Sequence, residues 1–314
     1  MKRRMIGIDI LRIFMAVLIL LRHTVTLGAC TLKHQEFILS QTGIVMSLFF
    51  MMSGYCLFSS YRGMESIQDI ILFYKKRFLR LMPTYWMVET YLLILALVTQ
   101  ENAAWRLEIF PVRILGMQIH YNIDVFAGVS WFISCLLVCY ILYPLIIIGI
   151  KSGHKPVRIL LMASIIFLLF YTVLLNLWAD DIPTYYSPYF RFLEFSYGIF
   201  LGFAGDRIDR ANWVPNTLIS LLILAGAIVV IELLIGIPSF QLIVYVFLAL
   251  IILSAGRISV SENLKVAKTI VFLSSLSFDV FILQDVLFSK PIYEAMGRYN
   301  GMKKLGSVKY FSHI

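Results

Sequence analysis

Long apolar runs alternate with short polar segments along the whole chain. Each run has about 17–24 residues, which at 1.5 Å per residue is enough for an α-helix to cross a hydrocarbon layer about 30 Å thick. The pattern predicts an all-α, polytopic transmembrane helix bundle of about nine spans. These spans are expected at residues 6–28, 38–60, 83–100, 127–150, 157–178, 189–205, 217–236, 239–255 and 268–288.

Two amphipathic segments between these runs are too short or too polar to span. FYKKRFLRLMP (73–83) is predicted to lie along the inner membrane surface and to end at Pro83. The segment 103–121 is predicted to lie at the opposite surface. The apolar side chains expected to face lipid in the first segment are Phe78, Leu79 and Leu81.

Composition and charge agree with a membrane protein. Hydrophobic residues make up 60% of the 314 residues and charged residues 14%, whereas a soluble domain is about half apolar and a quarter charged. The net charge of +9 needs no nucleic-acid partner, because the cations gather in alternate loops. With the N-terminus in the cytoplasm, the inner loops hold most of the Lys and Arg residues, which is the usual distribution for cytoplasmic loops of membrane proteins. The outer loops then hold Lys33, Arg106 and Arg113.

The two ends of the chain bear on this topology. The first run follows Lys2-Arg3-Arg4 but is long and charged, so it is interpreted as a permanent helix rather than a cleaved signal peptide. We expect one transmembrane domain over residues 1–288 and a short basic tail over 289–314. A nine-span count places this tail outside, against the charge rule, so either one span is miscounted or a last helix is missing.

The first run carries four ionisable side chains. Arg12 and His23 are eleven residues apart, about three helical turns, so they share one face about 16 Å apart along the axis. Asp9 lies one turn before Arg12. A charge at mid-helix costs about 2.5–3.5 kcal/mol, and such residues usually line an internal cavity. The alternatives are a structural Asp9–Arg12 pair and an interfacial His23, while Arg22 is expected to extend to the outer surface.

Six motifs in order along residues 6–284 resemble the membrane-bound acyltransferase 3 family. The first is an Arg, ten residues and a His, present as RIFMAVLILLRH from Arg12 to His23. The other five are FFMMSGYCL (49–57), KRFLRLMPTYW (76–86), VSWFISCLLVCYILYPL, RFLEFSYGIFLG and LSSLSFDVFILQ.

This resemblance implies an integral-membrane O-acyltransferase of the bacterial cytoplasmic (plasma) membrane. Acyl-CoA, acetyl-CoA first and succinyl-CoA as an alternative, is the implied co-substrate. The implied acceptor is a hydroxyl of an extracytoplasmic glycan or lipid-linked glycan. No bound cofactor is expected, and no metal site, because the five histidines are scattered along the chain.

Transfer from a thioester to a hydroxyl needs a group that removes the hydroxyl proton. His23 is the candidate, as a general base or as a transient acyl carrier. Arg77 and Arg80, one helical turn apart at the predicted cytoplasmic surface, are candidates for the phosphates of coenzyme A or for membrane anchors. Arg12 lies deeper and is a candidate for the pantetheine end or the thioester carbonyl.

For each of the other polar candidates, a structural role is the alternative to a role in the site. Ser53, with Gly54, marks a close helix contact or part of the site. Trp131 is a site residue or an interfacial belt residue. Arg191 and Glu194 are three apart on one helical face and are site residues or a pair at the membrane edge.

Two features depart from the family pattern. Gln284 stands where the family often has His, and an amide cannot accept a proton as imidazole does. The family usually has ten spans, so a degenerate, inactive member is one alternative. A transporter or glycan exporter is another, although the internal repeats and broken helices typical of transporters are not seen in the sequence.

Overall fold

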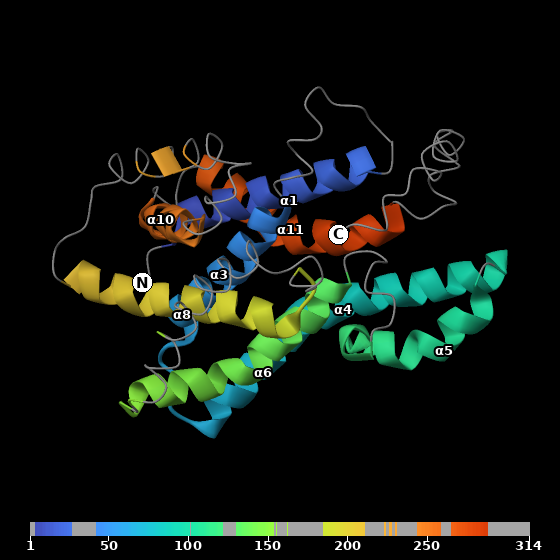
Figure 1. Ribbon diagram of the computed structural model, residues 1–314, viewed down its shortest axis with the longest axis horizontal. Coiled ribbons are helices and arrows are strands. Elements are labelled where there is room, and N and C mark those ends of the chain that lie inside the picture. Colours follow the sequence, from blue (N-terminus) through green and yellow to red (C-terminus); the bar gives the residue numbers. More distant parts are fainter. Residues whose placement is uncertain are drawn as a thin grey trace, which may run out of the picture.

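The computed structural model describes an all-helical chain (Figure 1). Eight α-helices and one short 3-10 helix form in the described part of the chain, and no strand is found there. The predicted spans 157–178 and 217–236, apart from isolated positions, and the tail 289–314 lie outside the described residues. The structure describes residues 4–26, 42–100, 102–121, 130–153, 185–210, 244–258 and 265–287, with single residues at 155, 162, 223, 226, 227 and 230.

Six helices coincide, within a few residues, with predicted spans. Apolar runs of this length form helices because only a helix satisfies all backbone polar groups within one segment in lipid. These helices are α1 (Ile6–Thr26), α3 (Thr42–Tyr61), α6 (Trp131–Lys151), α8 (Pro188–Arg210), α10 (Val244–Arg257) and α11 (Lys265–Leu287).

The prediction of a helix break at Pro83 is wrong. One helix, α4, runs from Ile67 to Thr99 with Pro83 inside it. Its start is specified by a capping box, in which the Ser66 hydroxyl accepts from the Asp69 N–H and the Asp69 carboxylate accepts from the Ser66 N–H. A proline removes one helical donor, a loss that neighbouring helices can compensate in a membrane bundle. At 33 residues, α4 is about 50 Å long and exceeds the apolar layer.

Continuity of α4 also changes which of its side chains face outward. Phe78 and Leu79 are exposed, as expected of lipid-facing residues, but Leu81 is only 3% exposed and packs in the core. The interpretation of Leu81 as lipid-facing is therefore wrong. At 100° per residue, Leu81 lies about 60° from Phe78 and about 160° from Leu79, on the side of the helix that packs into the core.

The second amphipathic segment folds back beside α4 (Figure 1). It forms α5 (Ala103–Ile114) and the 3-10 helix η1 (Gln118–Tyr121). With 12 residues, α5 is about 18 Å long and cannot span, as predicted. It is held to α4 by a buried ion pair, Arg113 Nε to Glu89 Oε2 at 2.7 Å, so Arg113 does not lie in an exposed outer loop.

Four helices are long and apolar enough to cross a membrane by length and composition: α3, α4, α6 and α11. Helix α10 is apolar but shorter. Helices α1 and α8 are 21 and 23 residues long but carry several charged side chains. The described part of the chain thus has the apolar helices of a membrane protein, and charged side chains are concentrated in α1 and α8.

Helix backbones approach closely where a glycine of one helix faces the backbone of the other. A Cβ placed on Gly54 of α3 would overlap the carbonyl oxygen of Phe195 in α8, and one on Gly198 would overlap that of Met51. Small residues allow this approach, which is the main packing interaction of bundles in lipid. The structure thus confirms the packing interpretation of Gly54, and α8 lies directly against α3.

Candidate functional site

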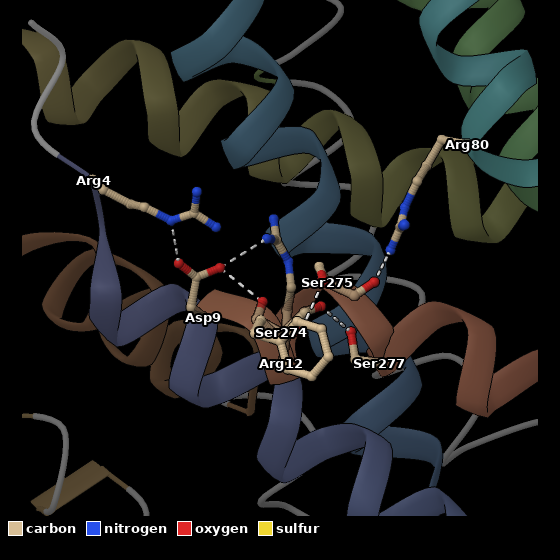
Figure 2. Close-up of polar contacts among 8 residues, drawn as sticks. Arg4, Asp9, Arg12, Arg80, Ser274, Ser275 and Ser277 are labelled. Carbon is tan, nitrogen blue, oxygen red and sulfur yellow. Dashed lines mark hydrogen bonds and ion pairs between the residues drawn. The ribbon is translucent and has the colours of Figure 1, made fainter. Parts of the chain in front are cut away.

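Asp9 joins the beginning of α1 to α11 (Figure 2). Its carboxylate accepts from Ser274 Oγ at 2.7 Å, and it pairs with Arg4 Nε at 2.9 Å and Arg12 Nη1 at 3.3 Å. Asp9 is 3% exposed, whereas the side chain of Arg12 is 33% exposed. The Asp9–Arg12 pair, the structural alternative for Arg12, is thus present. It leaves Arg12 partly accessible, with its guanidinium directed away from the α1 backbone (Figure 2).

A cavity of about 780 Å³ opens beside this pair. The beginnings of α1 and α11 and the ends of α3, α8 and α10 surround it. Among its described lining residues Asp9 is the one carboxylate. The net charge of the lining is therefore strongly positive and suits an anionic ligand. Its cationic residues are Arg4, Arg12, Arg62, Arg257 and Lys268.

Arg77 and Arg80 point to different neighbours. Arg77 Nη2 donates to Tyr61 Oη at 3.0 Å, and its guanidinium lies 5.1 Å from the centre of the Tyr61 ring. Arg80 donates to the carbonyl oxygen of Ser275 on α11 (Figure 2). It also lies 3.6 Å from Asp279 Oδ2 on the same helix. Neither residue lines the cavity. The structure does not bring Arg77 and Arg80 together as one phosphate clamp.

His23 and Arg22 lie near the far end of α1 and are half-buried. Burial raises the pKa of the Tyr185 and Tyr186 hydroxyls, and the positive charge of Arg22 acts on both in the opposite direction. The far end of α1 therefore lies close to the segment that precedes α8. Arg12 and His23 remain on one face, about 16 Å apart along the helix.

Arg191 and Glu194 form a fully buried network, not a pair at a membrane edge. Arg191 Nη1 lies 2.7 Å from Glu194 Oε2 and donates to Ser47 Oγ at 3.2 Å. Tyr245 Oη donates to the other carboxylate oxygen of Glu194 at 2.8 Å. Both charged residues are at most 2% exposed. The two residues do pair, but in the buried interior, and their further partners link α8 to α3 and α10.

Aromatic rings surround Arg191. Its guanidinium carbon lies 5.2 Å from the ring centre of Tyr185, 5.6 Å from that of Phe50 and 5.9 Å from that of Trp131. Trp131 is 5% exposed and contacts Tyr185 and Tyr186, so it packs inside the protein and is not an exposed belt residue.

A layer of three phenylalanines connects α3, α6 and α11. The ring centres of Phe49 and Phe132 are 6.1 Å apart, those of Phe49 and Phe281 6.3 Å, and those of Phe132 and Phe281 5.0 Å. Ser53 lies half-buried one turn from Phe49 on α3. Gln284, one turn beyond Phe281, is 1% exposed, and its amide atoms have no hydrogen-bond partner among the described residues.

Sequence reasoning missed Glu89, Arg113, Ser47 and Tyr245 as members of buried polar networks. A signal existed for Glu89, a carboxylate within an apolar run. Ser47 and Tyr245 are ordinary residues in spans and carry no such signal. No group of three or more His, Cys, Asp or Glu that could hold a metal ion occurs among the residues that the structure describes.

Comparison with known proteins adds the identity of the family. The model of the Acyltransferase domain (acyltransferase 3) family matches residues 5–302, nearly the whole chain. Searches of the curated proteins and of the solved structures find no match. The match contains the face of α1 with Arg12 and His23, all of the cavity lining except Arg4, and the buried network of α8. The chain belongs to the acyltransferase 3 family, and its apolar helices make it a membrane acyltransferase.

Proposed function

We propose that the protein transfers an acetyl group from acetyl-CoA to a hydroxyl of an extracytoplasmic glycan or lipid-linked glycan. The observation that carries this proposal is the cationic cavity at the beginning of α1, the helix that also holds His23. The nucleotide head of coenzyme A is a polyanion, and five cations against one carboxylate suit it. The family membership supports acyl transfer as the reaction.

The donor enters from the cytoplasm in this proposal. The loops at the cavity end of α1 are basic, which favours a cytoplasmic position in the cytoplasmic membrane. The phosphates contact the cavity cations rather than Arg77 and Arg80, since neither of these two lines the cavity. A thioester arm on the order of 15–20 Å, bound beside Arg12, extends along α1 toward His23, about 16 Å away.

His23 acts as the general base. Its imidazole takes the proton of the acceptor hydroxyl as the hydroxyl oxygen attacks the thioester carbonyl carbon. The carbon–sulfur bond then breaks, and the CoA thiolate leaves and takes up a proton. Arg12 binds the donor beside the cavity, with Asp9 holding its guanidinium in place. The half-buried position of His23 limits competing water.

Acetyl-CoA binding to the purified, detergent-solubilised chain tests the donor site. We expect saturable binding, weakened about tenfold or more by Arg12→Gln or Arg257→Gln because each change removes a charge-assisted hydrogen bond. Lys76→Gln is the matched control, since Lys76 is exposed on α4 and does not line the cavity. Absence of binding by the folded wild type would refute the donor assignment and favour an exporter or an inactive member.

Acetyl transfer to an envelope glycan fraction tests the catalytic assignment. We expect His23→Gln to bind acetyl-CoA normally and to lose about a hundredfold or more of the turnover, as loss of a general base does. An acetyl group trapped on the protein of the wild type would identify an acyl-carrier role instead. Unchanged turnover in both His23→Gln and Arg12→Gln would overturn the mechanism.

A further inference from the structure

The carboxylate of Asp9 has three partners, and they are not equally close (Figure 2). Ser274 Oγ donates to Oδ1 at 2.7 Å, and Arg4 Nε donates to Oδ2 at 2.9 Å. Both distances are typical of strong hydrogen bonds to a charged carboxylate. Arg12 Nη1 lies 3.3 Å from Oδ1, which is longer than such bonds usually are. Arg12 is therefore the most weakly held of these three partners.

Burial decides which members of this cluster can meet a ligand. Asp9 and Ser274 are buried, whereas the side chains of Arg4 and Arg12 are partly exposed. Both arginines line the cationic cavity. A guanidinium has five N–H donors, so Arg12 can contact Asp9 with one of them and a ligand with others. Two arginines against one carboxylate leave this part of the cavity wall with a net positive charge.

Ser274 and Arg12 share one oxygen of Asp9. The hydroxyl of Ser274 reaches Oδ1 from α11, and the guanidinium of Arg12 reaches the same atom from α1. Because a buried carboxylate needs its hydrogen bonds, removal of the hydroxyl leaves Oδ1 to Arg12 alone. The guanidinium would then move closer to Asp9, and its charge would be neutralised there. The hydroxyl of Ser274 thus controls how much of the Arg12 charge is directed at Asp9.

We propose that Ser274 is a positioning residue of the donor site. Its hydroxyl satisfies the Asp9 carboxylate together with Arg4, so that Asp9 fixes the Arg12 side chain beside the cavity without neutralising it. The positive charge of Arg12 then stays available to an anionic donor. This inference rests on the proposed function, because the donor is the acetyl-CoA assigned there to the cavity.

Acetyl-CoA binding to the full chain in detergent tests the role of Ser274. We expect Ser274→Ala to weaken binding about three- to tenfold, the equivalent of one hydrogen bond, because Arg12 turns toward Asp9 and away from the ligand. Ser277→Ala is the matched control and should bind like the wild type, since the Ser277 hydroxyl donates to a backbone carbonyl of its own helix (Figure 2). Unchanged binding by Ser274→Ala would overturn the positioning role.

A second substitution separates positioning from a merely structural role. Asp9→Asn removes the charge that competes with the ligand for Arg12. Binding by the double variant Ser274→Ala with Asp9→Asn should therefore return at least to the wild-type affinity. A structural defect at Ser274 would instead leave the double variant as weak as Ser274→Ala or weaker, and this result would overturn the proposal.

The salt dependence of binding gives a readout that needs no change at Asp9. With Arg12 turned toward Asp9, one cation fewer faces the ligand. The affinity of Ser274→Ala for acetyl-CoA should therefore fall less steeply with rising salt than that of the wild type. Weaker binding with the wild-type salt dependence would show a structural role and overturn the proposal. If the wild type binds no acetyl-CoA, the proposed function fails, and the role of Ser274 fails with it.

Discussion

Removing the charge of Glu194 should destabilise the protein strongly. Glu194→Gln keeps the side-chain shape but leaves the guanidinium of Arg191 buried without its counter-charge, at 2% exposure. Breaking a buried ion pair in this way costs about 3–5 kcal/mol. The lower end applies here, because the amide oxygen of Gln can still accept from Arg191, and three aromatic rings within 6 Å partly stabilise the cation.

Thermal unfolding in detergent, followed by light scattering or by a thiol-reactive dye, measures the effect. At about 2–4 °C for each kcal/mol, the melting temperature should fall on the order of 5–10 °C. Glu108→Gln, which neutralises an exposed carboxylate on α5, is the control and should change it little. A Glu194→Gln melting temperature within about 1 °C of the wild type would refute the reasoning.

A double variant separates the charge from the packing. Arg191→Met with Glu194→Leu removes both charges. Its melting temperature should lie closer to that of the wild type than the melting temperature of Glu194→Gln does, since replacing a buried ion pair by apolar residues of similar volume often causes no loss of stability. A residual loss of about 1–3 kcal/mol is expected because the Tyr245 hydroxyl loses its acceptor. If the double variant is no more stable than the single one, the network contributes through its hydrogen bonds rather than its charges.

Two further predictions concern packing and electrostatics. Gly198→Ala should lower the melting temperature far more than Gly63→Ala, because a methyl at Gly198 overlaps the Met51 carbonyl whereas one at Gly63 meets nothing within 4 Å. Equal melting of the two variants would contradict the close α3–α8 contact. Acetyl-CoA binding should weaken as salt rises, because ions screen the cavity charges, and titrations at low and high ionic strength would measure this. An affinity that does not depend on salt would argue against phosphate contacts in the cavity.

Helix positions and the shared face of Arg12 and His23 could be predicted because both depend on local sequence. Apolar length and the 3.6-residue period place a helix without knowledge of its neighbours. The same reasoning failed at Pro83, where the local signal for a helix end was overridden within the continuous helix α4. It also placed the Leu81 side chain toward lipid, whereas the continuous helix α4 turns this side chain into the core.

Partners across the bundle could not be predicted. Glu89 and Arg113 stand in separate segments, and only the return of α5 beside α4 makes them an ion pair. Arg77 and Arg80 are one turn apart in sequence, yet α3 binds one and α11 the other.

The sequence by itself determined the helical class, the membrane character and the polar face of α1. The family match over residues 5–302 agrees with the order of its motifs. The tertiary structure alone decided where the cations gather into a cavity, how deeply Arg191 and Glu194 are buried, and which buried polar atoms have no partner among the described residues. These properties depend on distances between helices far apart in the chain, and hydropathy and periodicity contain no information about such distances.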